Sequence, residues 1–201
     1  MAATNAALAV VGRAPLGSAT VLGFVGNGVR RLVAQSLAAA GGSQPRGATP
    51  SDRDFDRALA GFLSYYEEHL LDETRPYEGI VGALEALGDG GALLSVLTNK
   101  PGPLARSLLS GLGLGDRFFA VVGGEEGLPP KPDASGAERI IARSGSAPGE
   151  TLLVGDSPVD VQTARAARVA ACAVTWGFSP AGALRDASPD FLIEDPGALI
   201  R

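Results

Sequence analysis

Four polar residues of this 201-residue sequence follow short apolar runs that have the length of buried strands. Thr98 and Asn99 follow the first run, Lys131 comes shortly after the second, and Asp156 comes after the third. A hydroxyl and an amide beside a helix N-terminus can hold an anion such as phosphate. An ammonium group stabilises charge on a bound phosphate. A carboxylate at a strand tip suits a hard cation such as Mg2+.

Each of these positions also has a structural interpretation. Thr98 and Asn99 can form a polar turn that caps a helix, and Lys131, between two prolines, can be a solvated loop residue. Asp160 has the capping-box spacing from the serine three residues before it. The capping box does not explain why position 156 is an aspartate. This favours a functional role for the Asp156 carboxylate. Lys131 is one of two lysines among 17 basic residues, which favours a need for a compact charge. Both interpretations stay open for Lys131 and Asp160.

The second part of the chain, residues 76–201, alternates between strand and helix patterns. Strands are expected at 93–97, 118–122, 151–154, 170–174 and 191–193, and helices at 80–87, 103–113, 134–143 and 158–168. Continuously apolar strands with helical crossovers predict an α/β fold whose parallel sheet is covered on both faces. Ligands bind beyond the carboxyl ends of such strands, which is where the polar residues lie.

The first part, residues 1–75, is predicted to form a separate helical domain. Three helices are expected: residues 2–11, a helix capped by Asn27, and a long helix that begins at a capping box on Ser51. Apolar residues repeat at the helical period through both later segments. We therefore expect two domains, 1–75 and 76–201.

Composition excludes several function classes. The net charge of −5 argues against a nucleic-acid partner or an anionic membrane surface. One cysteine and one histidine exclude an intramolecular disulfide, a cysteine cluster and a multi-histidine metal site. No apolar run reaches the roughly 18 residues of a membrane span, and no basic residue precedes the apolar N-terminus. A cytoplasmic protein is expected, and the oligomeric state is not specified.

Taken together, the motifs resemble those of the haloacid dehalogenase (HAD) superfamily, and within it the phosphoglycolate phosphatase group. The superfamily resemblance rests on the runs Leu97-Thr98-Asn99-Lys100, Lys131-Pro132-Asp133 and Gly155-Asp156-Ser157-Pro158-Val159-Asp160. The closer resemblance rests on residues 23–30, 75–79 and 189–191. It covers nearly the whole chain.

The resemblance implies a Rossmann-like core, a small α-helical cap and a Mg2+-dependent phosphatase of small phosphorylated metabolites, with 2-phosphoglycolate the first candidate. Thr98 would bind the phosphoryl group with Asn99 alongside, and Lys131 would neutralise the phosphoryl oxygens and the nucleophile. Asp156 would bind Mg2+, supported by Asp160.

The turn Gly26-Asn27-Gly28 would face the active site from the cap and help to select the substrate. The alternative is that this turn only caps a helix.

One motif of the family is missing. Its Asp-x-Asp-Gly-Thr run, on the first and central strand, carries the nucleophile that becomes an aspartyl-phosphate, whereas residues 1–26 contain no Asp or Glu. The favoured explanation is a misplaced start codon or fragmentary gene model. A truncated, non-catalytic relative and a nucleophile supplied by another chain are the alternatives. The chain as written is therefore expected to be inactive.

Two other functions remain open. One is a catalytically silent protein that still binds a phosphorylated ligand. The other is a related sugar-phosphate phosphatase or mutase.

Overall fold

The computed structural model describes residues 1–26, 28–41, 52–124 and 127–200. The chain divides into two compact units, Met1–Glu73 (the N-terminal unit) and Thr74–Arg201 (the C-terminal unit). No helix in these described ranges combines the length and the apolar character needed to cross a bilayer.

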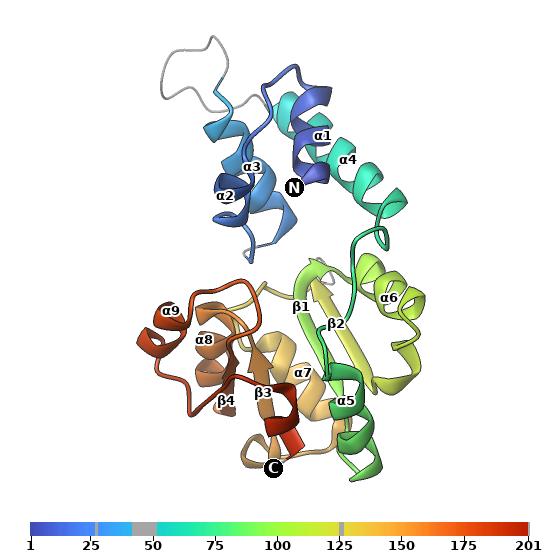
Figure 1. The fold of residues 1–201 in the computed structure, drawn as a ribbon, viewed down its shortest axis with the longest axis vertical. Coiled ribbons are helices and arrows are strands. Elements are labelled where there is room, and N and C mark those ends of the chain that lie inside the picture. The colour runs from blue at the N-terminus through green and yellow to red at the C-terminus, as the bar shows by residue number, and fades with distance from the viewer. Residues whose placement is uncertain (27, 42–51, 125–126, 201) are drawn as a thin grey trace. The chain divides into compact units, whose positions relative to one another are not determined.

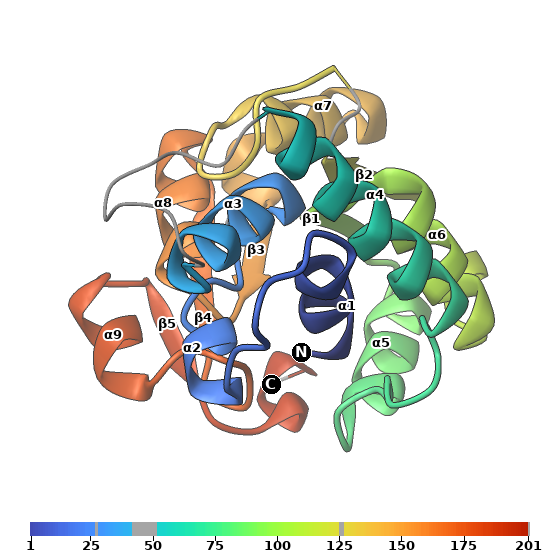
Figure 2. The ribbon, with the colours of Figure 1, turned by 90° about the horizontal axis from the view of Figure 1, so that it is seen from above.

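The N-terminal unit is helical (Figures 1 and 2). Its helices are α1 (Ala2–Val10), α2 (Ser18–Leu22), α3 (Val29–Ala39) and α4 (Asp52–Glu68). Leu8, Val33 and Ala58 are almost fully buried where α1, α3 and α4 pack together. The predicted helices are confirmed, whereas the five-residue α2 was not predicted because it is too short to show a period. Asn27 and Ser51, the expected caps, lie outside the described residues.

The C-terminal unit alternates helices and strands (Figure 1). Its elements are α5 (Ile80–Asp89), β1 (Ser95–Pro101), α6 (Gly102–Gly111), β2 (Ala120–Gly124), α7 (Ser135–Ser144), β3 (Leu152–Gly155), α8 (Pro158–Ala166), β4 (Ala170–Val174), α9 (Ala181–Asp186) and β5 (Phe191–Ile193). Short 3-10 helices occupy Gly115–Arg117, Pro148–Glu150 and Pro196–Ile200. All strand pairs are parallel, so the predicted α/β class is confirmed.

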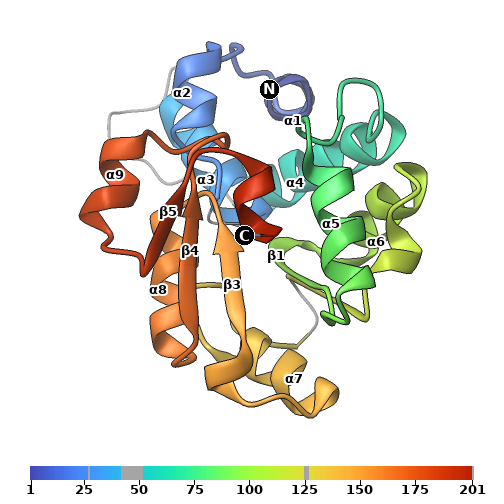
Figure 3. The same cartoon turned by 60° about the horizontal axis from the view of Figure 1, so that its bottom comes forward.

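The strands form two sheets rather than one. β1 pairs with β2, and β3, β4 and β5 form the second sheet (Figure 3). Within the described ranges no ladder joins β1 to β3, so β3 is an edge strand. Leu152 and Val154 on β3 are 46% and 42% exposed. The expectation of a sheet covered on both faces is therefore wrong for β3, an edge strand whose alternate residues Leu152 and Val154 are exposed.

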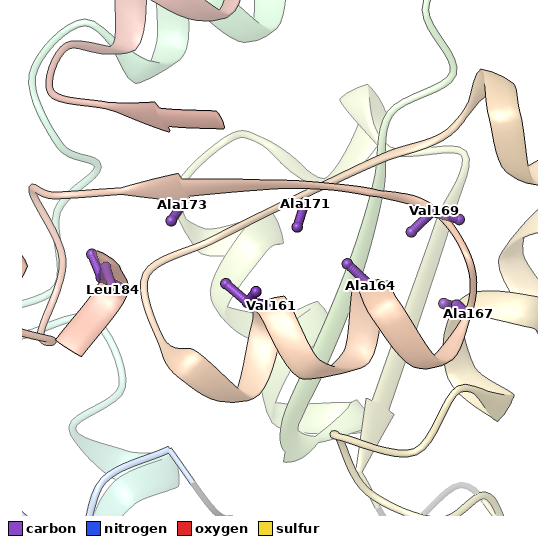
Figure 4. Close-up of a cluster of buried hydrophobic side chains, with 8 residues drawn as sticks. Val161, Ala164, Ala167, Val169, Ala171, Ala173 and Leu184 are labelled. Atoms are coloured by element: carbon purple, nitrogen blue, oxygen red, sulfur yellow. The ribbon is translucent and has the colours of Figure 1, made fainter. Parts of the chain in front are cut away.

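The core of the larger sheet is made of small aliphatic side chains. Val161 and Ala164 on α8 pack against Ala171 and Ala173 on β4, and Leu184 on α9 closes the cluster (Figure 4). Alanines on both surfaces bring the helix close to the strand. The Asp190 carboxylate accepts a hydrogen bond from the Ala171 N–H at 2.8 Å, which ties the start of β4 to the residue before β5.

Candidate active site

The carboxyl end of β1 extends further than the sequence predicts. The strand was expected to end at Leu97, but it continues to Pro101 and carries Thr98 and Asn99. Glycines on β2 make this possible. A Cβ on Gly123 would lie 2.2 Å from the Gly102 Cα, and one on Gly124 would lie 2.6 Å from the Asn99 carbonyl oxygen. Only residues without a side chain allow the two backbones to approach this closely.

Thr98 makes a local contact at this strand end. Its hydroxyl oxygen accepts a hydrogen bond from the Lys100 N–H at 3.1 Å. A hydroxyl that accepts in this way still has its own hydrogen to donate. The geometry is compatible with anion binding by Thr98, which stays a prediction.

Asn99 clamps the lysine loop to β1. Its side-chain amide donates to the Lys131 carbonyl at 3.1 Å, and its oxygen accepts from the Lys131 N–H at 2.7 Å. The two bonds fix the backbone of a residue 32 positions away. We therefore assign Asn99 a positioning role, and its expected contact with a phosphoryl group stays a prediction.

Lys131 reaches a buried carboxylate on the next segment. Its Nζ donates to Asp160 Oδ1 at 2.6 Å, with only 15% of the lysine and 7% of the aspartate side chain exposed. The other oxygen of Asp160 accepts bonds from the Ser157 N–H at 3.1 Å and the Ser157 hydroxyl. A Cβ on Gly155 would lie 2.3 Å from the Asp160 Cγ, so this glycine provides the space for the carboxylate. Asp160 thus completes the predicted capping box and also pairs with Lys131.

Asp156 lies one residue beyond the end of β3 and has a different partner. Its Oδ2 accepts a hydrogen bond from the Phe178 N–H at 2.8 Å, across the carboxyl ends of neighbouring β3 and β4. The described part of the chain contains no group of three or more His, Cys, Asp or Glu side chains that could hold a metal. Mg2+ sites use one or two carboxylates together with waters and substrate phosphates. The carboxylate of Asp156 fits part of such a site.

The network brings some predicted residues together and not others. Hydrogen bonds join Asn99, Lys131 and Asp160 into one chain of contacts. Asp156 is held separately, by Phe178.

The predicted substrate turn belongs to the N-terminal unit. Gly28 is the residue before α3, with φ of 84°, and Gly26 has φ of 114°. Positive φ angles favour glycine at both positions. Asn27 lies outside the described residues, so the substrate role of this turn stays a prediction.

Asp133, the third residue of the lysine motif, organises the start of α7. Its Oδ1 accepts bonds from the Ser135 hydroxyl and the Ser135 N–H. These bonds hold the pKa of the Asp133 carboxyl below its ordinary value, the Ser135 hydroxyl having the larger effect. Asp133 lies one residue before Ala134, the N-cap of α7, so its carboxylate orders the turn that leads into this helix.

A cavity of about 370 Å³ lies away from these residues. It is lined by Leu84, Glu85, Gly88, Asp89, Leu94 and Arg117. Leu94 precedes β1, so this cavity lies at the amino end of the strand, whereas ligands of parallel sheets bind at the carboxyl ends. Its size alone does not make it the site. The polar residues converge instead on a small recess that Thr98, Asn99 and Lys131 help to line.

The sequence did not predict the hydrogen bond between Phe178 and Asp156. The segment Trp176-Gly177-Phe178 follows β4, and nothing in its composition suggests a bond to a carboxylate 22 residues earlier. A glycine between two aromatic residues beyond a strand end was the only available signal.

Comparison with known proteins identifies the family of this chain. The family model described as haloacid dehalogenase-like hydrolase matches residues 5–174. The chain belongs to this family. The predicted superfamily is thereby confirmed on most of the sequence.

Relatives within the family carry a more specific name. The chain is 40% identical over 177 residues to the phosphoglycolate phosphatase of Rhodospirillum rubrum, covering 88% of this chain and 73% of that protein. It is 33% identical to phosphoglycolate phosphatase 1 of Pseudomonas aeruginosa, covering 96% and 70% of the two chains. The crystal structure of a predicted phosphoglycolate phosphatase from Haemophilus somnus superposes with a TM-score of 0.91 at 26% identity, covering 99% of this chain and 88% of that one. These similarities support a phosphatase of this family.

Proposed function

We propose that this chain is the greater part of a Mg2+-dependent phosphatase of small phosphorylated metabolites, with 2-phosphoglycolate as the first candidate substrate. The observation that carries the proposal is the Lys131 ammonium, which forms an ion pair with the buried Asp160 while its own side chain is only 15% exposed. Asn99 holds the backbone of this lysine in place. The name shared by the relatives supports this choice of substrate. In this proposal residues 1–75 form a cap and residues 76–201 form the catalytic core.

Lys131 and Thr98 would bind the phosphoryl group. An ammonium group has three donors, and Asp160 takes one of them, which leaves two for phosphoryl oxygens. Asp160 fixes the direction of the ammonium group. The Thr98 hydroxyl, which already accepts from Lys100, would donate its hydrogen to another phosphoryl oxygen.

Asp156 would be the protein ligand for Mg2+, and Phe178 holds one of its two oxygens. When bound, Mg2+ supplies positive charge that offsets the charge of the transferring phosphoryl group. Asp160 does not compete for the ion, because both of its oxygens are engaged by Lys131 and Ser157.

The nucleophilic carboxylate, in this proposal, lies on a segment outside the 201 residues. Residues 1–26 contain no Asp or Glu, and Asp156 and Asp160 have other roles. The unpaired edges of β1 and β3 in the described structure are compatible with a further strand between them. Such a strand would bring a carboxylate to the same sheet end as Thr98 and Asp156.

The test compares two proteins in phosphate release from 2-phosphoglycolate with Mg2+. One is residues 1–201, and the other is extended upstream in its gene to the first Asp-x-Asp-Gly-Thr. We expect turnover only from the extended protein. Equal turnover by the short form would place the nucleophile within these 201 residues and overturn the proposal.

Asp156→Asn in the extended protein tests the metal role. The amide is a poorer ligand for a hard cation, so we expect calorimetry to show strongly weakened Mg2+ binding with the fold retained. Unchanged Mg2+ affinity would show that Asp156 is not a ligand. A stop codon in frame directly upstream of Met1 would instead favour the catalytically silent alternative.

A further inference from the structure

The turn after β4 lies against Asp156. β3 and β4 are neighbouring parallel strands in the register Gly155 with Ala173, so the residues that follow them emerge side by side. Asp156 comes directly after β3, and the Phe178 N–H, beyond β4, donates to its Oδ2 at 2.8 Å. A backbone donor holds this oxygen without the conformational freedom of a side chain.

Gly177 provides the space for this contact. A Cβ placed on Gly177 would lie 2.1 Å from the Asp156 Cβ, 2.2 Å from its Oδ2 and 2.5 Å from its Cγ. Gly177 is not among the glycines with positive φ, so its backbone conformation does not require glycine. Glycine is required here because of space, and all three of the atoms nearest to the added Cβ belong to Asp156.

The two carboxylate oxygens of Asp156 therefore differ in their hydrogen bonds. Oδ2 is fixed by the Phe178 N–H, whereas Oδ1 accepts no hydrogen bond from any residue that the structure describes. Ser157, the next residue, directs its N–H and hydroxyl to Asp160 instead. A carboxylate held through one oxygen keeps the other available in a fixed direction.

We propose that Gly177 and the Phe178 N–H are positioning residues that hold Asp156 for cation binding. The inference rests on the proposed function for the identity of the cation, Mg2+. Partners that orient a metal ligand typically change metal affinity by about 10–100-fold when they are altered. Neither residue contacts the ion in this proposal; both act through the Asp156 carboxylate.

The metal-free test is hydrogen exchange at the Phe178 amide in residues 1–201. Exchange should be slow in the wild type and faster in Asp156→Ala, which removes the acceptor. It should also be faster in Gly177→Ala, whose new methyl group displaces the carboxylate. Gly182→Ala is the matched control, because a Cβ there has nothing within 4 Å. Equal exchange in the wild type and Asp156→Ala would overturn the inference, even if Gly177→Ala failed to fold.

The metal test uses Trp176, the single tryptophan of the chain, which lies next to Gly177. Its fluorescence is followed during titration with MgCl2 in the same proteins. The apparent Kd should rise by about 10–100-fold in Gly177→Ala and stay unchanged in Gly182→Ala. An unchanged Kd in Gly177→Ala would overturn the positioning role. If calorimetry showed that the wild type binds no Mg2+, the proposed cation would fail, and the exchange measurement would still decide whether the turn holds Asp156.

Discussion

At the residue scale, the proposed role of Lys131 depends on the compact shape of its ammonium group. It reaches Asp160 at 2.6 Å from a backbone that Asn99 clamps. Arginine keeps the charge, but its planar guanidinium is larger and spreads the donors. In the extended protein we expect Lys131→Arg to lower kcat by about 10²-fold or more, the loss seen when one donor to a reacting oxygen is removed.

The measurement is steady-state phosphate release, with the exposed Arg139→Lys on α7 as the control for a basic exchange. Near-normal turnover of Lys131→Arg would show that this loop is only structural.

Two ion pairs of the C-terminal unit differ in how far they are buried. Lys131 and Asp160 have 15% and 7% of their side chains exposed, whereas Arg117 and Glu85 have 33% and 50% exposed. Removing one partner of a buried pair leaves an uncompensated charge and costs about 3–5 kcal/mol, while an exposed pair contributes about 0–1 kcal/mol. Asp160→Ala should therefore destabilise the chain far more than Glu85→Ala does.

Urea denaturation of both variants and the wild type checks this expectation. Similar midpoints for Asp160→Ala and Glu85→Ala would mean that the lysine finds water or another partner when its aspartate is removed.

Sequence spacing identified Lys131, Asp156 and Asp160 as candidates, because each follows an apolar strand or a capping signal. It could not predict their partners. The bonds from Asn99 to Lys131 and from Phe178 to Asp156 join residues 32 and 22 positions apart, and only the packing of the strands brings them together.

At the scale of elements, strands differ in how well they could be predicted. β4 and β5 begin and end as expected, since both are apolar runs bounded by turn residues. β1 was predicted at 93–97 and is found at Ser95–Pro101. Its polar end continues as a strand because Gly123 and Gly124 on β2 let the two backbones approach closely. This contact joins segments that are distant in the sequence, so the pattern within β1 could not reveal it. The six-residue α9 is too short for periodicity to reveal it.

The central position of β4 makes a prediction about its cysteine. Cys172 is 4% exposed, and burial raises the pKa of its thiol above the ordinary value. The folded state therefore favours the neutral thiol. The stability that the neutral Cys172 thiol contributes is fully present below the pKa of the thiol in the unfolded chain. This stability is lost as the pH rises through the raised pKa of the thiol in the folded chain. Alkylation by iodoacetamide at alkaline pH should be much slower in folded chain than in urea.

Because this is the only cysteine, mass spectrometry reads its modification directly. Alkylation at equal rates with and without urea would contradict the burial of β4. Cys172→Ser should weaken the loss of stability with rising alkaline pH.

At the scale of the whole molecule, the divided sheet limits stability. β1 and β3 each have an edge with no partner strand in the described structure, and Leu152 and Val154 are partly exposed. A strand between them would add several ladder bonds, each contributing about 0.5–1.5 kcal/mol. Burying aliphatic side chains would add about 1.5–3 kcal/mol each. We expect the extended protein to melt at a clearly higher temperature than residues 1–201.

Leu152→Lys distinguishes a new strand from a general effect of length. The change should cost little in residues 1–201, where Leu152 is 46% exposed, and about 1.5–3 kcal/mol in the extended protein. Equal melting temperatures of the two unmutated proteins, or an equal effect of Leu152→Lys in both, would contradict a strand at this edge.

The two glycines that make room for the carboxylates have a consequence for how this gene can vary. Gly155 lies against Asp160 and Gly177 against Asp156, both at distances that exclude a Cβ. Every single-nucleotide change that replaces glycine by another amino acid introduces a Cβ, because all other amino acids carry this atom. No amino acid that one nucleotide change can introduce fits at either position. In a selection for function, both codons should therefore vary only at their third base, while Gly149, with open space around it, accepts replacements.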